Sequence, residues 1–257
     1  MDAAKFRALF DLTGRTAIIT GGTRGIGRAI AEGFTLAGAN VVVASRKADA
    51  CVETVAALEA LGGSALGVPT HMGETEGLRA LVDATVERFG GVDIVVNNAA
   101  NALTEPLATA SAAAYGKSFD VNVRGPLVLS QAAYPHLVRS EHASIINVIS
   151  VGAITWSPGM ALYSAAKSAL LSFTRNLAAE WATDGIRVNA LAPGTVDTDM
   201  VRNNGPEAAA RMASISFQRR AAHADEMVGP ALLLASDAGS YVTGQMLVAD
   251  GGYAVPR

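Results

Sequence analysis

The chain has 257 residues, of which 50% are hydrophobic, and its formal net charge is −3 at pH 7. This length supports one α/β domain with a large core, so we expect a single domain over residues 1–257. The small negative charge argues against nucleic acid or an anionic membrane as a partner. No apolar run reaches the ~20 residues that span a bilayer, and no signal peptide is evident. Because the chain holds one cysteine, Cys51, no internal disulfide can form, and we expect a cytoplasmic protein.

Short apolar runs alternate with helix-like segments along the chain. The predicted strands are 16–20, 40–44, 64–69, 92–97, 144–150, 186–192 and 245–249. The predicted helices are 25–37, 48–61, 74–89, 111–139, 161–183 and 224–236. This alternation is typical of βαβ units and predicts a Rossmann-type, doubly wound parallel sheet of seven strands with helices on both faces. A ligand of such a sheet binds at the carboxyl ends of the strands.

Residues 195–223 break the alternation and hold one short helix-like piece, 206–213. Long inserts of this kind often close over a substrate, so we expect a lid here. Candidate apolar contacts in the lid are Met200, Met212, Ile215 and Phe217. The stretch between Ser150 and Tyr163 offers a facing wall, with Ile154, Trp156, Pro158 and Met160. These side chains favour a mainly apolar substrate, although ordinary packing, or a subunit contact at Trp156, would also account for them.

A glycine-rich segment, GGTRGIG at 21–27, joins the first predicted strand to an amphipathic helix. Gly21 permits a tight turn, Gly25 lets the backbone approach a pyrophosphate, and Gly27 lets the helix pack closely on the strand. The helix N-terminus would attract the phosphates. The spacing is G-x-x-x-G-x-G rather than the common G-x-G-x-x-G. The residues that we predict to bind a dinucleotide here are Gly21, Thr23, Arg24, Gly25, Ile26 and Gly27.

The end of the second predicted strand bears on the choice of dinucleotide. An NAD site usually places an acidic residue there, which binds the ribose 2′-hydroxyl. This chain has Ser45 and then Arg46, with Arg24 in the first turn. Two guanidinium groups would attract a 2′-phosphate, so we predict NADP(H) as the cofactor, with NAD(H) as the alternative. Arg46 could also simply begin a solvated helix.

Tyr163 and Lys167 stand four residues apart in YSAAK, and Ser150 lies thirteen residues before the tyrosine. A spacing of four places both side chains on one face of a helix, about one turn apart. A nearby ammonium favours the phenolate and would lower the phenol pKa from its usual ~10. Such a phenol can act as a general acid or base for a carbonyl or an alcohol, and Ser150 could bind the same oxygen. On its own, YxxxK also fits a surface tyrosine beside a solvated lysine.

Six motifs together resemble the short-chain dehydrogenase/reductase family from about residue 12 to DGG at 250–252. They are TGGTRGIG at 20–27, NNAA at 97–100, Asn122 in DVNVRG, Ser150, YSAAK at 163–167 and PGTVDT at 193–198. The resemblance implies that Tyr163 exchanges the proton and that Lys167 lowers its pKa and holds the nicotinamide ribose. It implies that Ser150 orients the substrate oxygen and that Asn122 keeps a water in a proton relay.

The resemblance also assigns further cofactor contacts. These are Asn98, Ala99, Pro193, Gly194, Val196 and Thr198, in addition to Tyr163 and Lys167. The chain departs from the family at Ala100, where a glycine is usual, and at His71, where many members place an aspartate against the adenine amine. We expect the adenine contact to pass to the backbone at His71 and Met72 or to the His71 imidazole. In the family, the helices that correspond to 111–139 and 161–183 pair between subunits, which predicts a homotetramer.

These observations predict an NADP(H)-dependent oxidoreductase that acts as a carbonyl reductase or alcohol dehydrogenase on a small-molecule substrate. One alternative is an NAD(H)-linked alcohol dehydrogenase, and another is a non-catalytic dinucleotide sensor or scaffold. The complete set of Ser150, Tyr163 and Lys167 argues against the sensor, which would need no proton relay. The four histidines are scattered along the chain and lack metal-ligand spacing, so we expect no metal site.

Overall fold

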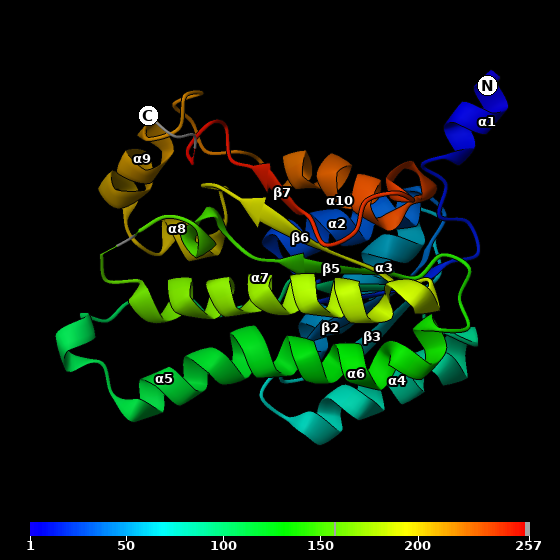
Figure 1. Ribbon diagram of the computed structural model, residues 1–257, viewed down its shortest axis with the longest axis horizontal. Coiled ribbons are helices and arrows are strands. Elements are labelled where there is room, and N and C mark those ends of the chain that lie inside the picture. Colours follow the sequence, from blue (N-terminus) through cyan, green and yellow to red (C-terminus); the bar gives the residue numbers. More distant parts are fainter. Residues whose placement is uncertain (157, 255–257) are drawn as a thin grey trace.

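Seven strands form one parallel sheet in the computed structural model, which describes residues 1–156 and 158–254 (Figure 1). The strands are β1 Thr16–Thr20, β2 Asn40–Ser45, β3 Ala65–Pro69, β4 Ile94–Asn97, β5 Ser144–Val148, β6 Arg187–Pro193 and β7 Met246–Ala249. Their order in the sheet is β3-β2-β1-β4-β5-β6-β7, so the direction of winding reverses between β1 and β4. The predicted doubly wound fold is confirmed, and each predicted strand lies within two residues of the observed one.

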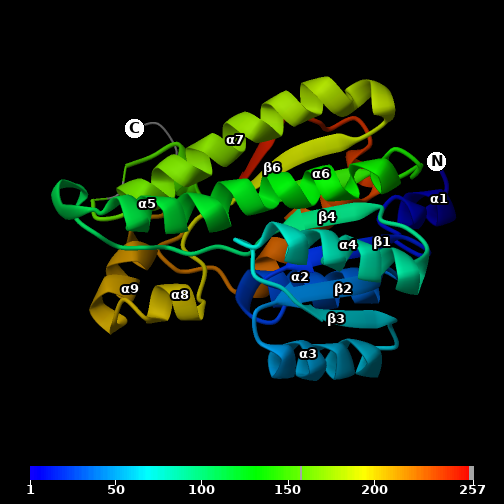
Figure 2. The ribbon, with the colours of Figure 1, turned by 90° about the horizontal axis from the view of Figure 1, so that it is seen from below.

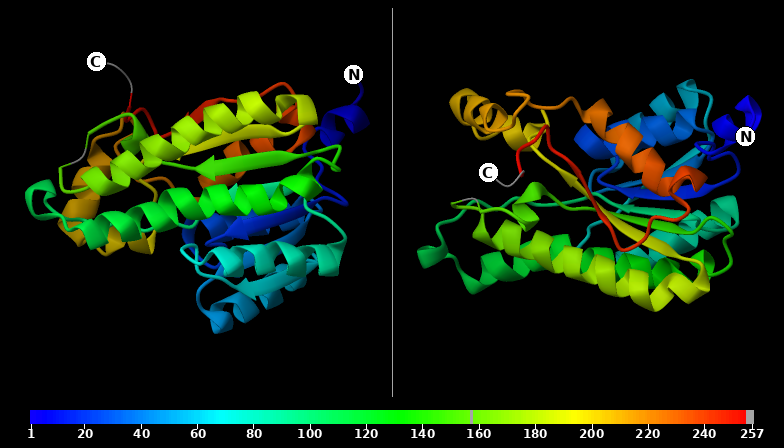
Figure 3. Two further views of the ribbon diagram at one scale, coloured as in Figure 1. Left: turned by 60° about the horizontal axis from the view of Figure 1, so that its bottom comes forward. Right: turned by 45° about the horizontal axis from the view of Figure 1, so that its top comes forward.

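Both faces of the sheet are buried, which explains why the strands are continuous apolar runs. Successive residues point to opposite faces, so Ile19 packs in one core cluster and Ile18 in the other. The helices on the Ile19 face are α2 Gly25–Leu36, α3 Ala48–Ala60 and α10 Val228–Ala235. The helices on the Ile18 face are α4 Thr75–Phe89, α6 Gly125–Leu137 and α7 Ala161–Trp181 (Figure 3).

The sequence-based prediction of one helix over 111–139 is wrong. The segment contains α5 Ala112–Phe119, a π-helical turn Asp120–Arg124, and then α6. Apolar periodicity reveals which face of a helix is buried, but a widening of the hydrogen-bond ladder by one residue leaves that pattern almost unchanged. The short helix α1 Ala3–Ala8, which has no buried residue, was also not predicted.

The predicted lid segment carries two short helices, α8 Asp199–Arg202 and α9 Pro206–Ser214, and the latter matches the predicted 206–213. Both lie beyond the carboxyl ends of the strands, apart from the helices that cover the sheet (Figure 2). In the described part of the chain, no helix combines the length and the apolar character needed to cross a membrane.

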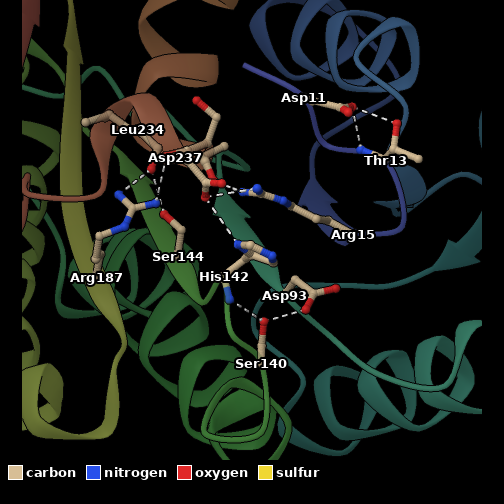
Figure 4. Close-up of polar contacts among 12 residues, drawn as sticks. Asp11, Thr13, Arg15, Asp93, Ser140, His142, Ser144, Arg187, Leu234 and Asp237 are labelled. Atoms are coloured by element: carbon tan, nitrogen blue, oxygen red, sulfur yellow. Dashed lines mark hydrogen bonds and ion pairs between the residues drawn. The ribbon is translucent and has the colours of Figure 1, made fainter. Parts of the chain in front are cut away.

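A polar network ties the elements together at the opposite end of the sheet, where the strands begin (Figure 4). The Arg15 guanidinium lies 2.9 Å from the Asp237 carboxylate, and His142 Nδ1 lies 3.2 Å from the same group. Arg187 and Ser144 both donate to the Leu234 carbonyl, at 2.7 and 2.9 Å. These contacts join the start of three strands to the end of α10, so they leave the carboxyl edge free for a ligand.

Candidate active site

Most of the predicted cofactor contacts lie at the carboxyl edge of the sheet, where β1, β2, β3, β4 and β6 end, and Tyr163 and Lys167 reach the same edge from α7. The glycine-rich turn after β1 and the segment after β4 are bonded to each other: Asn98 Nδ2 donates to the Thr20 carbonyl at 2.9 Å, and the Thr20 hydroxyl accepts from the Asn98 N–H at 3.0 Å. Carboxyl ends of neighbouring parallel strands necessarily lie side by side, which brings together residues almost 80 positions apart.

Tyr163 and Lys167 lie one turn apart on α7, as the spacing predicts. Lys167 is 1% exposed, and its Nζ lies 5.6 Å from the centre of the Tyr163 ring. The ammonium donates to the Val148 carbonyl at the end of β5, over 2.8 Å. Ser150 follows the same strand, and its hydroxyl accepts from the Gly152 N–H at 3.1 Å and acts on the Tyr163 phenol in the direction that lowers the phenol pKa. The structure therefore brings the three predicted catalytic groups together, with Tyr163 and Lys167 buried and Ser150 half-buried.

The charge state of this cluster differs from the expectation that the lysine lowers the phenol pKa. Burial raises the pKa of Tyr163 to about 12, and the hydrogen bond with Ser150 opposes that shift only in part. Burial also lowers the pKa of Lys167 to about 7. The physical cause is the same for both groups, because a site without water disfavours phenolate and ammonium alike. At neutral pH the tyrosine is thus a protonated acid, ready to donate rather than to accept a proton.

Asn122 lies inside the π-helical turn between α5 and α6 and is fully buried. Its side-chain amide is bonded on both atoms by Asn101: Asn122 Oδ1 accepts from the Asn101 N–H at 3.2 Å, and Nδ2 donates to the Asn101 carbonyl at 2.9 Å. The sequence reasoning did not single out Asn101. The signal that could have found it is a lone amide in the alanine-rich run AANAL.

The glycine-rich turn has the shape and the donors that a pyrophosphate requires. Gly21 has φ +65°, in the left-handed region, and a Cβ on Gly27 would overlap Asn98 Nδ2 and the Gly21 carbonyl oxygen. Helix α2 begins at Gly25 without a side-chain cap, so its first N–H groups face outward with the positive end of the helix dipole. These residues fit a dinucleotide cofactor.

The end of β2 provides polar and basic groups where a ribose would lie. The Thr23 hydroxyl donates to Ser45 Oγ over 3.1 Å, which joins the glycine-rich turn to the second strand. Arg24 and Arg46 are both exposed. The Arg24 guanidinium lies 3.7 Å from the Asp199 carboxylate at the start of α8. The structure thus places two exposed cations beside this position.

Two predicted adenine contacts, at His71 and Met72, have different surroundings. His71 Nδ1 accepts from the Gly73 N–H at 3.1 Å, so its other nitrogen carries the proton in the neutral ring. The Met72 side chain is buried in the core cluster on the α6 face. A contact between Met72 and a cofactor would therefore fall to its backbone.

Residues 195–223, the predicted lid, are joined at their base and carry several exposed apolar side chains. The two ends pair, because the Ala222 N–H donates to the Thr195 carbonyl at 2.9 Å. Thr198, one of the predicted cofactor contacts, lies directly against Gly25 of the glycine-rich turn. Phe217 and Met200 in the lid are 63% and 43% exposed, and Trp156 in the facing stretch is 83% exposed. Ser157, within that stretch, lies outside the described residues.

Comparison with known proteins agrees with this geometry. A family model described as enoyl-(acyl carrier protein) reductase matches residues 21–254. The chain is 39% identical over 244 residues to the short-chain dehydrogenase/reductase SDRA of Arabidopsis thaliana, covering 94% of this chain and 95% of that protein. It is 38% identical over 246 residues to 3beta-hydroxysteroid dehydrogenase 1 of Eggerthella lenta, covering 94% of each. The crystal structure of 3-oxoacyl (acyl-carrier-protein) reductase from Agrobacterium tumefaciens C58 with NADP bound has a TM-score of 0.90, 32% identity, and coverage of 96% of this chain and 97% of that chain.

Proposed function

Since the chain belongs to the short-chain dehydrogenase/reductase family, we propose that it is an NADP(H)-dependent oxidoreductase that interconverts an apolar ketone or aldehyde and the corresponding alcohol. The observation that carries this proposal is the cluster of buried Tyr163 and Lys167 with half-buried Ser150, which lies at the same sheet edge as an uncapped, glycine-rich helix start. A binding protein without catalysis would have no use for a desolvated phenol beside a desolvated ammonium.

Each residue of the site has its own role in the reduction. When bound, the nicotinamide supplies the hydride to the carbonyl carbon. Ser150 holds the carbonyl oxygen, and Tyr163 donates its proton to that oxygen as the negative charge develops. The raised pKa of Tyr163 keeps the proton available at neutral pH. Lys167 anchors the end of β5 and provides the positive charge that stabilises the phenolate left after transfer.

The preference for NADP(H) rests on the cations beside the end of β2. Arg24 and Arg46 are exposed and can reorient, and the strand ends in Ser45 rather than in an acidic residue. A guanidinium matches the geometry of a phosphate with two parallel N–H donors. Arg24 would exchange its exposed ion pair with Asp199, which contributes little, for the 2′-phosphate. The NADP bound to the Agrobacterium reductase is consistent with this assignment.

An apolar substrate is supported by the side chains around the site. Trp156 and Ile154 lie after β5, and Met200, Ile215 and Phe217 belong to the lid, and all five are more than 40% exposed. Large exposed apolar side chains around a site are consistent with a surface that a ligand covers. We infer that residues 195–223 close over the substrate and cover this surface. A hydroxysteroid dehydrogenase among the relatives acts on a substrate of this character by its name.

The test is a panel of apolar ketones, aldehydes and secondary alcohols, assayed with NADPH, NADP, NADH and NAD by absorbance of the reduced nicotinamide. We expect turnover of at least one aromatic ketone with NADPH, and a loss of about 10²-fold or more in kcat for Tyr163→Phe. The NADPH dissociation constant of Tyr163→Phe should stay close to that of the wild type. Tight NADPH binding without turnover across the panel would instead support a dinucleotide sensor.

The assembly and location of the protein are further parts of the proposal. Helices α5, α6 and α7 carry alanine and leucine on more than one face, and we propose that they pair between subunits of a cytoplasmic homotetramer. Light scattering coupled to size exclusion measures the mass of the assembly directly. A monomer at micromolar concentration would contradict this part without affecting the catalytic assignment.

A further inference from the structure

The π-helical turn at Asp120–Arg124 is held by side-chain amides from outside and inside the helix. In a regular α-helix the carbonyls of Lys117 and Ser118 accept from backbone N–H groups four residues later. Here Asn101 Nδ2 donates to the Lys117 carbonyl at 3.0 Å, and Asn122 Nδ2 donates to the Ser118 carbonyl at 2.9 Å. Two successive carbonyls at the start of the turn thus receive amide donors from asparagines. Isolated π-helical turns are uncommon and concentrate at functional sites.

The side chain of Asn101 also binds Asn122 directly. Asn122 Nδ2 lies 2.8 Å from Asn101 Oδ1, so its two hydrogens are shared among this oxygen and the carbonyls of Asn101 and Ser118. Any residue other than proline could supply the backbone bonds at position 101. The Asn101 amide supplies both an acceptor for Asn122 and a donor for the Lys117 carbonyl, so the side chain adds a constraint that an apolar residue would lack.

This polar chain leads to the catalytic tyrosine. Asn122 Nδ2 lies 3.4 Å from Ser118 Oγ, and Ser118 Oγ donates to the Leu162 carbonyl at 3.5 Å. Leu162 immediately precedes Tyr163 on α7, and the π-helical turn packs against α7. Ser118 and Asn122 are both fully buried. A shift of Asn122 would therefore displace the first turn of α7, which carries the Tyr163 phenol.

We propose that the Asn101 side chain is a positioning residue that holds the π-helical turn open and fixes the amide of Asn122 for proton transfer at Tyr163. The proposal rests on the proposed oxidoreductase function for its catalytic consequence. Its structural part, the hold of Asn101 on residues 117–124, stands on the hydrogen bonds alone. The Asn122 amide cannot rotate without losing its part-buried bonds to Asn101 and its buried bond to the Ser118 carbonyl.

The decisive variant is Asn101→Leu, which keeps the size and the backbone bonds and removes both amide functions. The matched control is Asn176→Leu, because Asn176 Nδ2 likewise donates to a helix carbonyl, that of Ser172 at 2.8 Å, but from an exposed position on α7. Amide hydrogen exchange of residues 117–124 should become faster in Asn101→Leu and stay unchanged in the control. Unchanged exchange, or a crystal structure with the turn and Asn122 unmoved, would overturn the proposal whether or not the protein turns over a carbonyl.

Kinetics test the catalytic part with NADPH and benzil, an apolar aromatic diketone. We expect Asn101→Leu to lower kcat by about 10-fold or more while the NADPH dissociation constant changes little, because only proton transfer is affected. Because Asn101 acts through Asn122, the double variant with Asn122→Ala should be no slower than Asn122→Ala alone. Fully multiplicative losses would refute the action through Asn122. Absence of turnover in the wild type would instead count against the proposed function, and hydrogen exchange would still decide the role of Asn101.

Discussion

Replacement of Lys167 by methionine should change how the stability of the cofactor-free protein depends on pH. Lys167 is 1% exposed, and its ammonium donates to the Val148 carbonyl at 2.8 Å. Burial lowers the pKa of this lysine from 10.5 to about 7. Methionine has a similar length, fills the same apolar space and carries no charge, so Lys167→Met removes the titration while largely keeping the packing.

The sign and size of the effect follow from the two pKa values. Between pH 7 and 10.5 the unfolded chain binds a proton at Lys167 that the folded chain has released, so the free energy of unfolding rises with pH in this window. The full cost of burying the ammonium is present below pH 7. From pH 7 to pH 9.5 the group should add about 3 kcal/mol to stability, as an order of magnitude. The raised pKa of Tyr163 acts oppositely, but its loss of stability begins above the usual phenol value of 10.

The assay is urea unfolding of the wild type, Lys167→Met and the control Lys117→Met at pH 7, 8.5 and 9.5. Lys117 is exposed on α5, so its replacement controls for the loss of a lysine at the surface. Subtracting Lys167→Met from the wild type cancels all other titrating groups. Over this range the unfolding free energy of the wild type should rise by about 3 kcal/mol relative to that of Lys167→Met. A difference that is flat with pH would refute the desolvation of the ammonium, and with it the account of the catalytic cluster.

Three further predictions concern the cofactor and substrate sites. Gly27→Ala should reduce NADPH affinity and stability by a few kcal/mol in total, because the added methyl overlaps Asn98 Nδ2. The control Gly116→Ala has open space around the new methyl and should be neutral or stabilising by ~1 kcal/mol. Fluorescence titration measures the affinity, and thermal unfolding measures the stability. Arg46→Ala should weaken NADPH by about 10-fold and NADH far less, in the same titration. Trp156→Ala should raise KM for aromatic ketones about 10-fold and leave a short aliphatic ketone unaffected, in steady-state assays.

Each of these predictions has an outcome that contradicts it. Wild-type affinity for NADPH in Gly27→Ala would show that the glycine-rich turn tolerates a side chain and is not closely packed. Equal losses for NADPH and NADH in Arg46→Ala would remove the 2′-phosphate assignment. An unchanged preference for aromatic ketones in Trp156→Ala would place that side chain outside the substrate pocket and favour a subunit contact.

Much of the architecture and most of the candidate site could be derived from the sequence alone. The seven strands were found because both faces of a parallel sheet are buried, which makes each strand a continuous apolar run bounded by polar turns. The positions of the glycine-rich turn, Ser150 and Tyr163 followed from topology, since every parallel strand ends at the same edge. The spacing of Tyr163 and Lys167 sets their geometry because both lie on one rigid helix.

Other properties depend on contacts between distant segments, and they cannot be predicted from the order of the amino acids alone. The pKa values of Tyr163 and Lys167 turned on how completely β5 and α7 exclude water, a property of packing rather than of spacing. The π-helical turn and the amide bonds from Asn101 likewise arise only when the loop after β4 meets the helix beyond it. The sequence determined which elements form and which side chains share an edge, because those follow from local periodicity. The tertiary structure decided burial, protonation and orientation, because each is set by neighbours that the chain brings from far away.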